Sequence, residues 1–340
     1  MKRAQAIVAL VLAVLLSPVA KGEDAKVALK LAHWLPQAHP LHQSLQQWAD
    51  SIGKESNGSI AVTIFPSEQL GRAFDGYDIA RDGIADIALV APGYQPGRFP
   101  ISAAGEMPFL ISDAKLATPA YDSWYRAFAA AEMKDTHYCT GMLRAAAFFQ
   151  SRTKPIVAPS DVKGMHVRPS DGTMANFVTL LGGTNVQTSP AASRDLLERG
   201  VADATIFPWG STVLFGVDKA VKYHLNMPVE MGVFVVVINK AHYEALSPAQ
   251  RKVMDNHCTT EWGSKLGNPW AEFEDAGLAK IAAQPGHEIV KPTAEQIALW
   301  RVAAEPLVKE WGNAVRKAGG DSDKIMSDFV AKLDQHHAKF

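Results

Sequence analysis

Apolar and polar positions along the chain follow two periods, which predicts a mixture of strands and helices. Residues 27–34 read as a strand, and the apolar residues of 41–52 recur at helical spacing immediately afterwards. The turn pair Asn-Gly lies at the start of residues 57–65, which then alternate as a half-buried strand. A second helix is expected over residues 73–82. This alternation of strands and helices is typical of an α/β fold.

One short phrase occurs twice. Residues 81–90 read RDGIADIALV and residues 198–207 read ERGVADATIF. In each copy a glycine, Gly83 or Gly200, follows a helical segment, where glycine readily takes the left-handed conformation that ends a helix. A short buried strand follows each glycine. The repeat predicts two similar α/β lobes. The alternative is coincidence, because helix–glycine–strand units are common in α/β proteins.

The rest of the chain continues the pattern. Residues 164–169 predict a strand, and residues 174–183 predict a helix that ends at a glycine pair. The long apolar run at 232–240 suits a buried central strand or a crossing between lobes. Capping signatures at Ser247 and Thr293 mark helix starts. Because no proline- or serine-rich linker separates the lobes, we expect a hinged clamp. The remaining helical stretches are 249–284, 294–317 and 322–337.

The N-terminus has the three-part plan of a secretory signal peptide. Two basic residues precede an apolar run at 6–16, and the helix-breaking Pro18 and small residues follow. The predicted signal peptide is 1–22, with cleavage at Ala20 or Ala25 as alternatives, so the mature protein is expected to begin near Glu23 and to be periplasmic. The alternative, an uncleaved membrane anchor, is disfavoured because the apolar run is too short for a comfortable bilayer span.

Composition narrows the classes of function. The chain has 340 residues, enough for two domains, and a formal net charge of −1. A net charge so close to zero gives no positive electrostatic field that would attract nucleic acid or an anionic membrane, so neither is expected as a partner. The two cysteines, Cys139 and Cys258, can form a disulfide in an oxidising compartment. Two cysteines are too few to indicate a disulfide framework, however, and buried free thiols are more common.

Arg168 is the most informative single residue. It ends the strand expected at 164–168, Pro169 stops that strand, and Ser170 or Asp171 can cap the next helix. In open α/β sheets ligands bind at the carboxyl ends of strands, and a guanidinium matches a carboxylate. The alternative is a surface arginine paired with Asp171.

Aromatic residues end several other expected strands. They are Trp34, Tyr94, Phe149, Phe207 and Trp209. An aromatic cleft with one cation would suit a small apolar or aromatic acid. For each of them, ordinary packing in a core or between lobes is the alternative.

Signals for catalysis or metal binding are weak. The chain has no nucleophile elbow, phosphate-binding loop or dinucleotide glycine fingerprint. His39 and His42, like His336 and His337, have no acidic or cysteine partner at ligand spacing. No cofactor and no metal are expected.

With these features the chain resembles the DctP-type solute-binding proteins of TRAP (tripartite ATP-independent periplasmic) transporters. The most specific stretch is KPIVAPSDVKGMHVRPSD. Four others, LKLAHWLPQAHPLHQSLQQWAD, QLGRAFDGYDIARDGIADIALVAPGY, LLERGVADATIFP and INKAHYEALSPAQRKVM, match in order. The resemblance implies a two-lobed periplasmic-binding-protein-like α/β fold with hinge strands, a long helix spanning both lobes, and no catalysis. The expected lobes are 26–147 plus 236–275, and 148–235 plus 276–340 with the C-terminal helices.

The resemblance also implies roles for single residues. Arg168 falls on the arginine that forms a two-pronged salt bridge with the ligand carboxylate. Tyr94 falls where an aromatic ring commonly flanks the ligand, and Trp34 falls at another ligand-facing position. The implied partners are a small-molecule carboxylate and the membrane permease subunits, and the protein is expected to be a monomer.

Three departures from the family pattern suggest an apolar ligand. Ala147 stands where a second polar contact is common, Phe207 replaces an asparagine, and Ala192 or Ser193 replaces a glutamate. A second ligand carboxylate facing these residues would be buried without a partner. The hypothesis is a monocarboxylate with an apolar or aromatic tail, and a 2-oxo or 2-hydroxy group that Gln150 would bond. Alternatives are an exported α/β enzyme, or a binding protein that serves a sensor or an ATP-driven importer.

Overall fold

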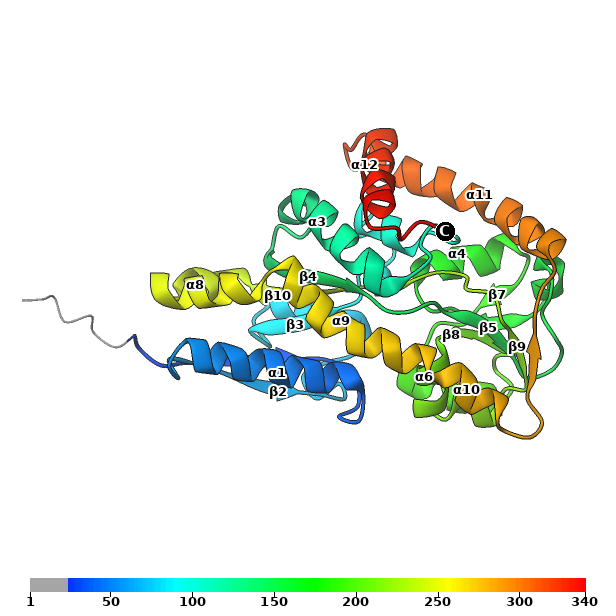
Figure 1. Ribbon diagram of the computed structural model, residues 1–340, viewed down its shortest axis with the longest axis horizontal. Coiled ribbons are helices and arrows are strands. Elements are labelled where there is room, and N and C mark those ends of the chain that lie inside the picture. Colours follow the sequence, from blue (N-terminus) through cyan, green and yellow to red (C-terminus); the bar gives the residue numbers. More distant parts are fainter. Residues whose placement is uncertain (1–23) are drawn as a thin grey trace, which may run out of the picture.

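The computed structural model describes residues 24–340, so the predicted signal peptide lies outside the described residues. Two α/β lobes lie side by side along the long axis of the molecule (Figure 1). Each is built on one sheet, which confirms the predicted two-lobed α/β fold. No helix in the described part of the chain is both long and apolar enough to cross a bilayer.

The first sheet has five strands. In spatial order they are β2 (Ile60–Phe65), β1 (Val27–Ala32), β3 (Ile87–Val90), β10 (Val233–Asn239) and β4 (Thr136–Leu143). β1 pairs in parallel with β2 and β3, whereas β10 runs antiparallel to both of its neighbours. Every residue of β10 is buried, as its unbroken apolar run predicts for a central strand.

The second sheet has six strands. In spatial order they are β11 (Glu288–Val290), β9 (Tyr223–Leu225), β5 (Phe148–Ser151), β8 (Ala204–Phe207), β6 (His166–Arg168) and β7 (Thr184–Asn185). β6 and β8 are parallel neighbours, so their carboxyl ends meet at one edge of the sheet.

Helices cover the faces of both sheets. They are α1 (Pro40–Glu55), α2 (Gly76–Arg81), α3 (Ala114–Glu132), α4 (Gly172–Leu180), α5 (Ser193–Glu198), α6 (Trp209–Leu214), α7 (Lys240–Ala245), α8 (Pro248–His257), α9 (Thr260–Asp275), α10 (Gly277–Ala282), α11 (Ala294–Lys317) and α12 (Ser322–Gln335). The capping boxes predicted at Ser247 and Thr293 are both formed. Thr259 caps α9 through its side chain, and together with the break at Ala276 this divides the expected 249–284 stretch into three helices.

The repeated phrase occupies equivalent positions in the two lobes. Gly83 has φ +71° and Gly200 has φ +72°, the left-handed conformation predicted for both. Each is followed by an alanine, Ala85 or Ala202, that is fully buried. The phrase therefore ends α2 and α5 and starts β3 and β8.

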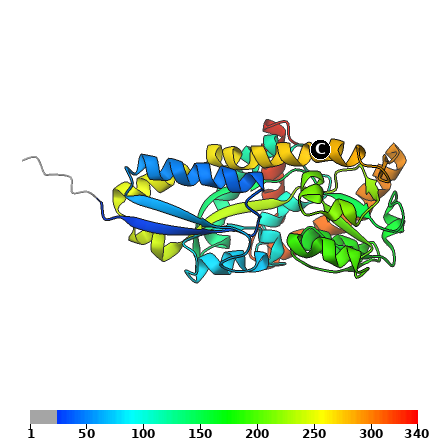
Figure 2. The ribbon, with the colours of Figure 1, turned by 90° about the horizontal axis from the view of Figure 1, so that it is seen from below.

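Two extended segments and one helix connect the lobes. Residues 144–147 run from β4 to β5, and residues 226–232 run from β9 to β10. They hydrogen-bond to one another as antiparallel neighbours, with the Ala147 amide 3.0 Å from the Glu230 carbonyl. α9 crosses from the first lobe to the second (Figures 1 and 2) and contacts α1 and α3 on one side and α6 on the other.

The C-terminal helices also touch both lobes. α11 lies along α4 of the second lobe, whereas α12 packs on α3 of the first. The Trp124 indole of α3 donates to the Ile325 carbonyl of α12 at 3.2 Å. We call α11 and α12 the C-terminal clasp. The three connections and this clasp together favour a hinge-bending motion between the lobes over free rotation.

Cys139 and Cys258 form a disulfide. The expectation that buried free thiols are more common therefore fails here. Cys139 lies in β4, and Cys258 lies in the short turn between α8 and α9. The bond attaches the beginning of the lobe-spanning helix to the first sheet.

Candidate functional site

A cavity lies between the lobes, where strands of both sheets end. It comprises about 370 Å³ of space not filled by atoms, part of which is open to solvent. Its lining residues are Trp34, Leu35, Tyr94, Arg144, Arg168, Ser170, Pro190, Ile206, Phe207, Pro208, Ser211, Phe215, Phe234 and Trp270. Four of the residues predicted from the sequence, Trp34, Tyr94, Arg168 and Phe207, are thus brought together.

Arg168 carries a buried charge that has no salt-bridge partner among residues 24–340. It is the last residue of β6 and is 2% exposed. Its Nε and Nη2 atoms donate to the Thr188 carbonyl at 3.3 and 3.0 Å, and its Cζ lies 5.1 Å from the centroid of the Phe207 ring. Within residues 24–340 it forms no salt bridge. Burial lowers the pKa of Arg168, and the neighbouring Tyr94 hydroxyl opposes that shift.

The alternative of a surface arginine paired with Asp171 is wrong. Arg168 is buried, and the Asp171 side chain instead caps α4 by accepting from the Met174 amide at 2.9 Å. The hydroxyl oxygen of Ser170, the other capping candidate, lies 3.0 Å from Asp171 Oδ2. Asp171 therefore bonds to groups other than Arg168, and the Arg168 guanidinium lines the cavity.

Arg144 is a second buried arginine in the same cavity, and the sequence analysis missed it. Its Nη2 lies 2.5 Å from Glu230 Oε1, and Ser170 Oγ donates to the same oxygen at 2.7 Å. Burial alone would disfavour the charge on Arg144, but the adjacent Glu230 carboxylate outweighs it, and the pKa of Arg144 is raised. The two arginines thus differ: Arg144 is neutralised within the protein, whereas Arg168 is not.

One wall of the cavity is a continuous row of aromatic rings. Ring centroids lie 5.6 Å apart for Trp34 and Tyr94, 5.8 Å for Trp34 and Phe234, and 4.6 Å for Phe234 and Trp270. Such spacings fall within the range of favourable tilted and edge-to-face contacts. The row offers a flat apolar substituent a large area of ring surface.

The facing wall comes from the second lobe. Phe207 ends β8, and its ring meets that of Phe215 edge to face at 5.9 Å. Pro190, Ile206 and Pro208 complete this apolar surface. Phe207 is also the ring beneath the Arg168 guanidinium, so the cation and the apolar wall are held together.

A buried carboxyl group fixes one end of the row of rings. Glu274 of α9 accepts from the Trp270 indole at 2.8 Å and from the Ser211 amide at 2.7 Å, and the Ser211 hydroxyl also donates to it. Burial raises the pKa of Glu274. Since α9 reaches both lobes, Glu274 joins Trp270 to Ser211 of α6 on the second lobe.

Three residues expected to line the cleft, Phe149, Gln150 and Trp209, do not line this cavity. The Phe149 ring lies in the core of the second lobe, 5.2 Å from that of Trp300. The Trp209 ring packs 4.6 Å from that of Phe148. Phe149 sits in the middle of β5 rather than at a strand end, which is why its side chain enters the core.

The amide of Gln150 is used within the protein. It donates to Thr212 Oγ1 at 2.6 Å and to the Phe207 carbonyl at 3.0 Å, and its oxygen lies 3.1 Å from His224 Nδ1. The side chain is fully buried. The structure therefore gives no support to a contact between Gln150 and a 2-oxo or 2-hydroxy group.

Histidines do not gather into a metal site in the part of the chain that the structure describes, where no three His, Cys, Asp or Glu side chains group suitably. His39 is buried edge-on against Trp270, with ring centroids 5.0 Å apart, and burial lowers its pKa to about 3. A neutral imidazole there contributes packing to the aromatic wall.

Comparisons with known proteins identify one family and similar solved structures. The family model described as bacterial extracellular solute-binding protein, family 7 (DctP) matches residues 31–314. A solute-binding protein of Albidiferax ferrireducens is 22% identical over 319 residues, covering 90% of this chain and 89% of that one.

Two solved structures share the fold closely. A TRAP solute-binding protein from Rhodoferax ferrireducens, in complex with copurified benzoate, is 26% identical, with a TM-score of 0.85 over 92% of this chain and 99% of that chain. A marine metagenome TRAP solute-binding protein specific for aromatic acid ligands, in complex with 3-hydroxybenzoate, is 27% identical with the same TM-score and coverage.

Proposed function

Because the chain belongs to the DctP family, family 7 of the bacterial extracellular solute-binding proteins, we propose that it captures an aromatic monocarboxylate for a TRAP transporter. The capturing group is Arg168. The rings of both lobes hold the apolar part of the ligand, and closure of the lobes removes water from it.

The observation that carries this proposal is the contrast between the two buried arginines. A carboxylate ligand supplies the counter-charge that Arg168 lacks within residues 24–340. A second ligand carboxylate would have to compete with Glu230 for Arg144. Since an unpaired buried carboxylate is costly, the cavity favours a ligand with one acid group.

The residues that line the cavity indicate what kind of apolar group the ligand carries. The lining apart from the two arginines and two serines is aromatic, aliphatic or proline. Each Å² of apolar ligand surface removed from water contributes about 25 cal/mol before the costs of ordering. A flat ring suits the row formed by Trp34, Phe234 and Trp270. The benzoate and 3-hydroxybenzoate bound to the two similar proteins support this choice of ligand.

The test measures binding of benzoate by calorimetry. Losing one partner of a buried ion pair costs roughly 2–5 kcal/mol, so we expect Arg168→Ala to raise the Kd roughly 30-fold to several-thousand-fold. The matched control is Arg199→Ala, because that arginine is exposed and pairs only with Asp195 on the surface of α5. A change of less than threefold for Arg168→Ala would place the site elsewhere, and so would tighter binding of succinate than of every aromatic acid tested.

The setting of this capture is also part of the proposal. Family members act outside the cytoplasm, and we infer that residues 1–22 direct export and are cleaved. The mature protein would then release its ligand, chemically unchanged, to the membrane subunits. Mass spectrometry of the periplasmic protein gives its first residue, and chromatography of benzoate after incubation with it checks that no turnover occurs.

A further inference from the structure

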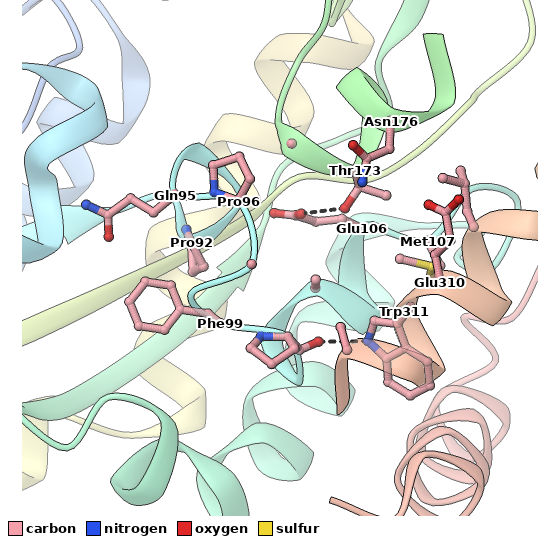
Figure 3. Close-up of a pocket in the computed structure, with 17 residues that line it drawn as sticks. Pro92, Gln95, Pro96, Phe99, Glu106, Met107, Thr173, Asn176, Glu310 and Trp311 are labelled. Atoms are coloured by element: carbon pink, nitrogen blue, oxygen red, sulfur yellow. Dashed lines mark hydrogen bonds between the residues drawn. The ribbon is translucent and has the colours of Figure 1, made fainter. Parts of the chain in front are cut away.

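A second, larger cavity lies between the lobes. It encloses about 670 Å³ and shares no lining residue with the cavity at Arg168. Its walls come from residues 92–107 of the first lobe, from the N-terminal part of α4 in the second lobe, and from α11 (Figure 3). A molecule bound there would touch both lobes and one helix of the C-terminal clasp.

The distinctive polar group of this cavity is the carboxyl of Glu106. Glu106 is 2% exposed, and its Oε2 accepts from Thr173 Oγ1 at 3.1 Å, as the dashed line in Figure 3 marks. Within residues 24–340 it has no other side-chain hydrogen bond and no salt bridge. A Cβ added to Gly93 would clash with the Glu106 carboxyl, so the glycine leaves room for the carboxyl in its present position. Burial, reinforced by the charges of Asp171 and Glu230, raises the pKa of Glu106.

The rest of the lining defines the chemistry of an occupant. Two acids, Glu106 and Glu310, line the cavity, and no lysine, arginine or histidine does. Phe99, Trp311 and Met107 contribute apolar surface, and the Trp311 indole is held by the Pro100 carbonyl at 2.7 Å. The remaining residues, mostly prolines, glycines and alanines, are Pro92, Pro96, Gly97, Pro100, Ala103, Gly172, Leu307 and Ala314, with Gln95, Thr173 and Asn176 as the neutral polar ones.

A bound ammonium ion would stabilise the charged form of the Glu106 carboxyl, and the aromatic rings beside it favour a cation with an apolar body. A bare divalent metal ion would need about six oxygen ligands, and the described residues contain no group of three acidic, histidine or cysteine side chains suited to a metal. The volume likewise suits a molecule rather than an ion. The chemistry therefore favours an organic ammonium ion whose nitrogen meets Glu106 and whose apolar part lies against Phe99 and Trp311.

We propose that the cavity around Glu106 is a second binding site, for an organic ammonium ion, and that its occupation strengthens carboxylate binding at Arg168. Two features couple the sites. Opening the lobes separates Glu106 from Thr173, so an occupant favours the closed arrangement. In addition, Glu106, Asp171 and Glu230 are all buried and all interact with the charge of Arg144, and a bound carboxylate adds another negative charge that an ammonium would offset.

The first experiment uses benzylammonium and 2-phenylethylammonium, with benzyl alcohol as the uncharged comparison. We expect the ammonium ions, and not the alcohol, to raise the melting temperature and to give a calorimetric Kd. Glu106→Gln keeps the shape and removes the charge, so it should weaken ammonium binding at least about tenfold. Glu305→Gln, at an exposed position of α11 outside the lining of this cavity, is the matched control. If neither ammonium ion binds, or if Glu106→Gln binds them as well as the native protein does, the proposal is overturned.

A second variant keeps the proposal testable if Glu106→Gln does not fold. Ala314→Phe leaves Glu106 intact and fills the cavity from α11, so it should also abolish ammonium binding. Should Glu106→Gln fail to fold, unchanged ammonium binding by Ala314→Phe would by itself overturn the proposal.

The coupling rests on the proposed function, whereas the ammonium site does not. Arg168→Ala should lose benzoate and keep the ammonium ion, and Glu106→Gln should do the reverse. In the native protein a saturating ammonium ion should tighten benzoate binding by about threefold or more, and benzoate should tighten ammonium binding by the same factor. Failure of benzoate alone would contradict the proposed function, and ammonium binding with no mutual effect would contradict the coupling.

Discussion

Two buried arginines, Arg144 and Arg168, line the same cavity, but only Arg144 is paired with Glu230. Glu230 Oε1 accepts from both the Arg144 guanidinium and the Ser170 hydroxyl, while Glu230 Oε2 is buried and has no hydrogen-bond partner among residues 24–340. The carboxylate is therefore positioned to neutralise Arg144 and not to contact the ligand. On this view Glu230 determines how many acid groups the cavity accepts.

Replacing Glu230 should change the preference for the number of acid groups. Glu230→Gln keeps an acceptor oxygen for Ser170 and removes the charge that balances Arg144, so the freed guanidinium can pair with a second ligand carboxylate. We expect the ratio of affinities for phthalate isomers over benzoate to rise at least about tenfold, roughly 1.4 kcal/mol. Calorimetry with both ligand types measures the ratio. Glu230→Asp retains the charge and should leave it unchanged; an unaltered ratio for Glu230→Gln would contradict this role.

Asp171 gives the protein a stability that falls with rising pH. Burial and the nearby Glu230 charge raise the pKa of Asp171 from 3.8 to about 7. Between these values the folded state holds a proton that the unfolded state has lost, so the free energy of unfolding decreases as the pH rises from about 4 to about 7, by at most about 1.4 kcal/mol per pH unit. Asp171→Asn keeps a helix-capping side chain and cannot titrate.

The measurement for Asp171 is the melting temperature of the native protein and of Asp171→Asn from pH 4 to pH 8. Glu106, Glu230 and Arg144 all interact with Asp171, so the difference between the two proteins is the informative quantity. We expect the variant to gain stability relative to the native protein as the pH rises to about 7. Parallel curves would show that Asp171 is not protonated in the folded protein.

At the scale of elements, one strand boundary explains most of what the sequence did not predict. The run MLRAAAF at 142–148 predicts one strand, with Phe149 directly after it. In the structure β4 ends at Leu143 in the first sheet and β5 begins at Phe148 in the second. Arg144 is therefore the residue at a strand end, and Phe149 is a core residue. Periodicity alone cannot locate a crossing between sheets when both sides of it are apolar.

Other parts of the site were predictable because local signals mark them. Arg168, with a proline after it, and Phe207, at the end of the repeated phrase, lie at the carboxyl ends of parallel strands as expected. Phe234 and Trp270 were not foreseen. Phe234 is the second residue of a fully buried strand, and Trp270 lies on the helix that crosses both lobes. Only the tertiary arrangement turns them toward the cavity.

The disulfide gives a prediction at the same scale. Cys139 and Cys258 are 119 residues apart in sequence, so the bond restricts a long loop in the unfolded chain. We expect the double variant Cys139→Ser, Cys258→Ser to lose about 2–5 kcal/mol in the free energy of unfolding, measured in urea. Its benzoate affinity should be unchanged, because neither cysteine lines the cavity. Two thiols that react in the unreduced native protein would contradict the bond.

For the whole molecule, function depends on how the lobes are joined. The crossing segments 144–147 and 226–232 carry Arg144 and Glu230, so the ion pair that sets the charge of the cavity also links the two strands of the hinge. α9 spans the lobes, and α12 holds α11 to the first lobe. A ligand at Arg168 and a ring at Trp34 lie on opposite sides of this hinge, so binding both requires the lobes to approach.

Closure makes a prediction for the shape of the protein in solution. Benzoate should reduce the radius of gyration measured by small-angle scattering, because a carboxylate on Arg168 and the aromatic wall of the first lobe are brought into contact. Trp34 and Trp270 line the cavity, so tryptophan fluorescence should change over the same range of benzoate concentration. Arg168→Ala, at a benzoate concentration that saturates the native protein, should show neither change. A fluorescence change with a constant radius of gyration would mean that the ligand enters an already closed cavity, and the hinge would then serve entry and release rather than capture.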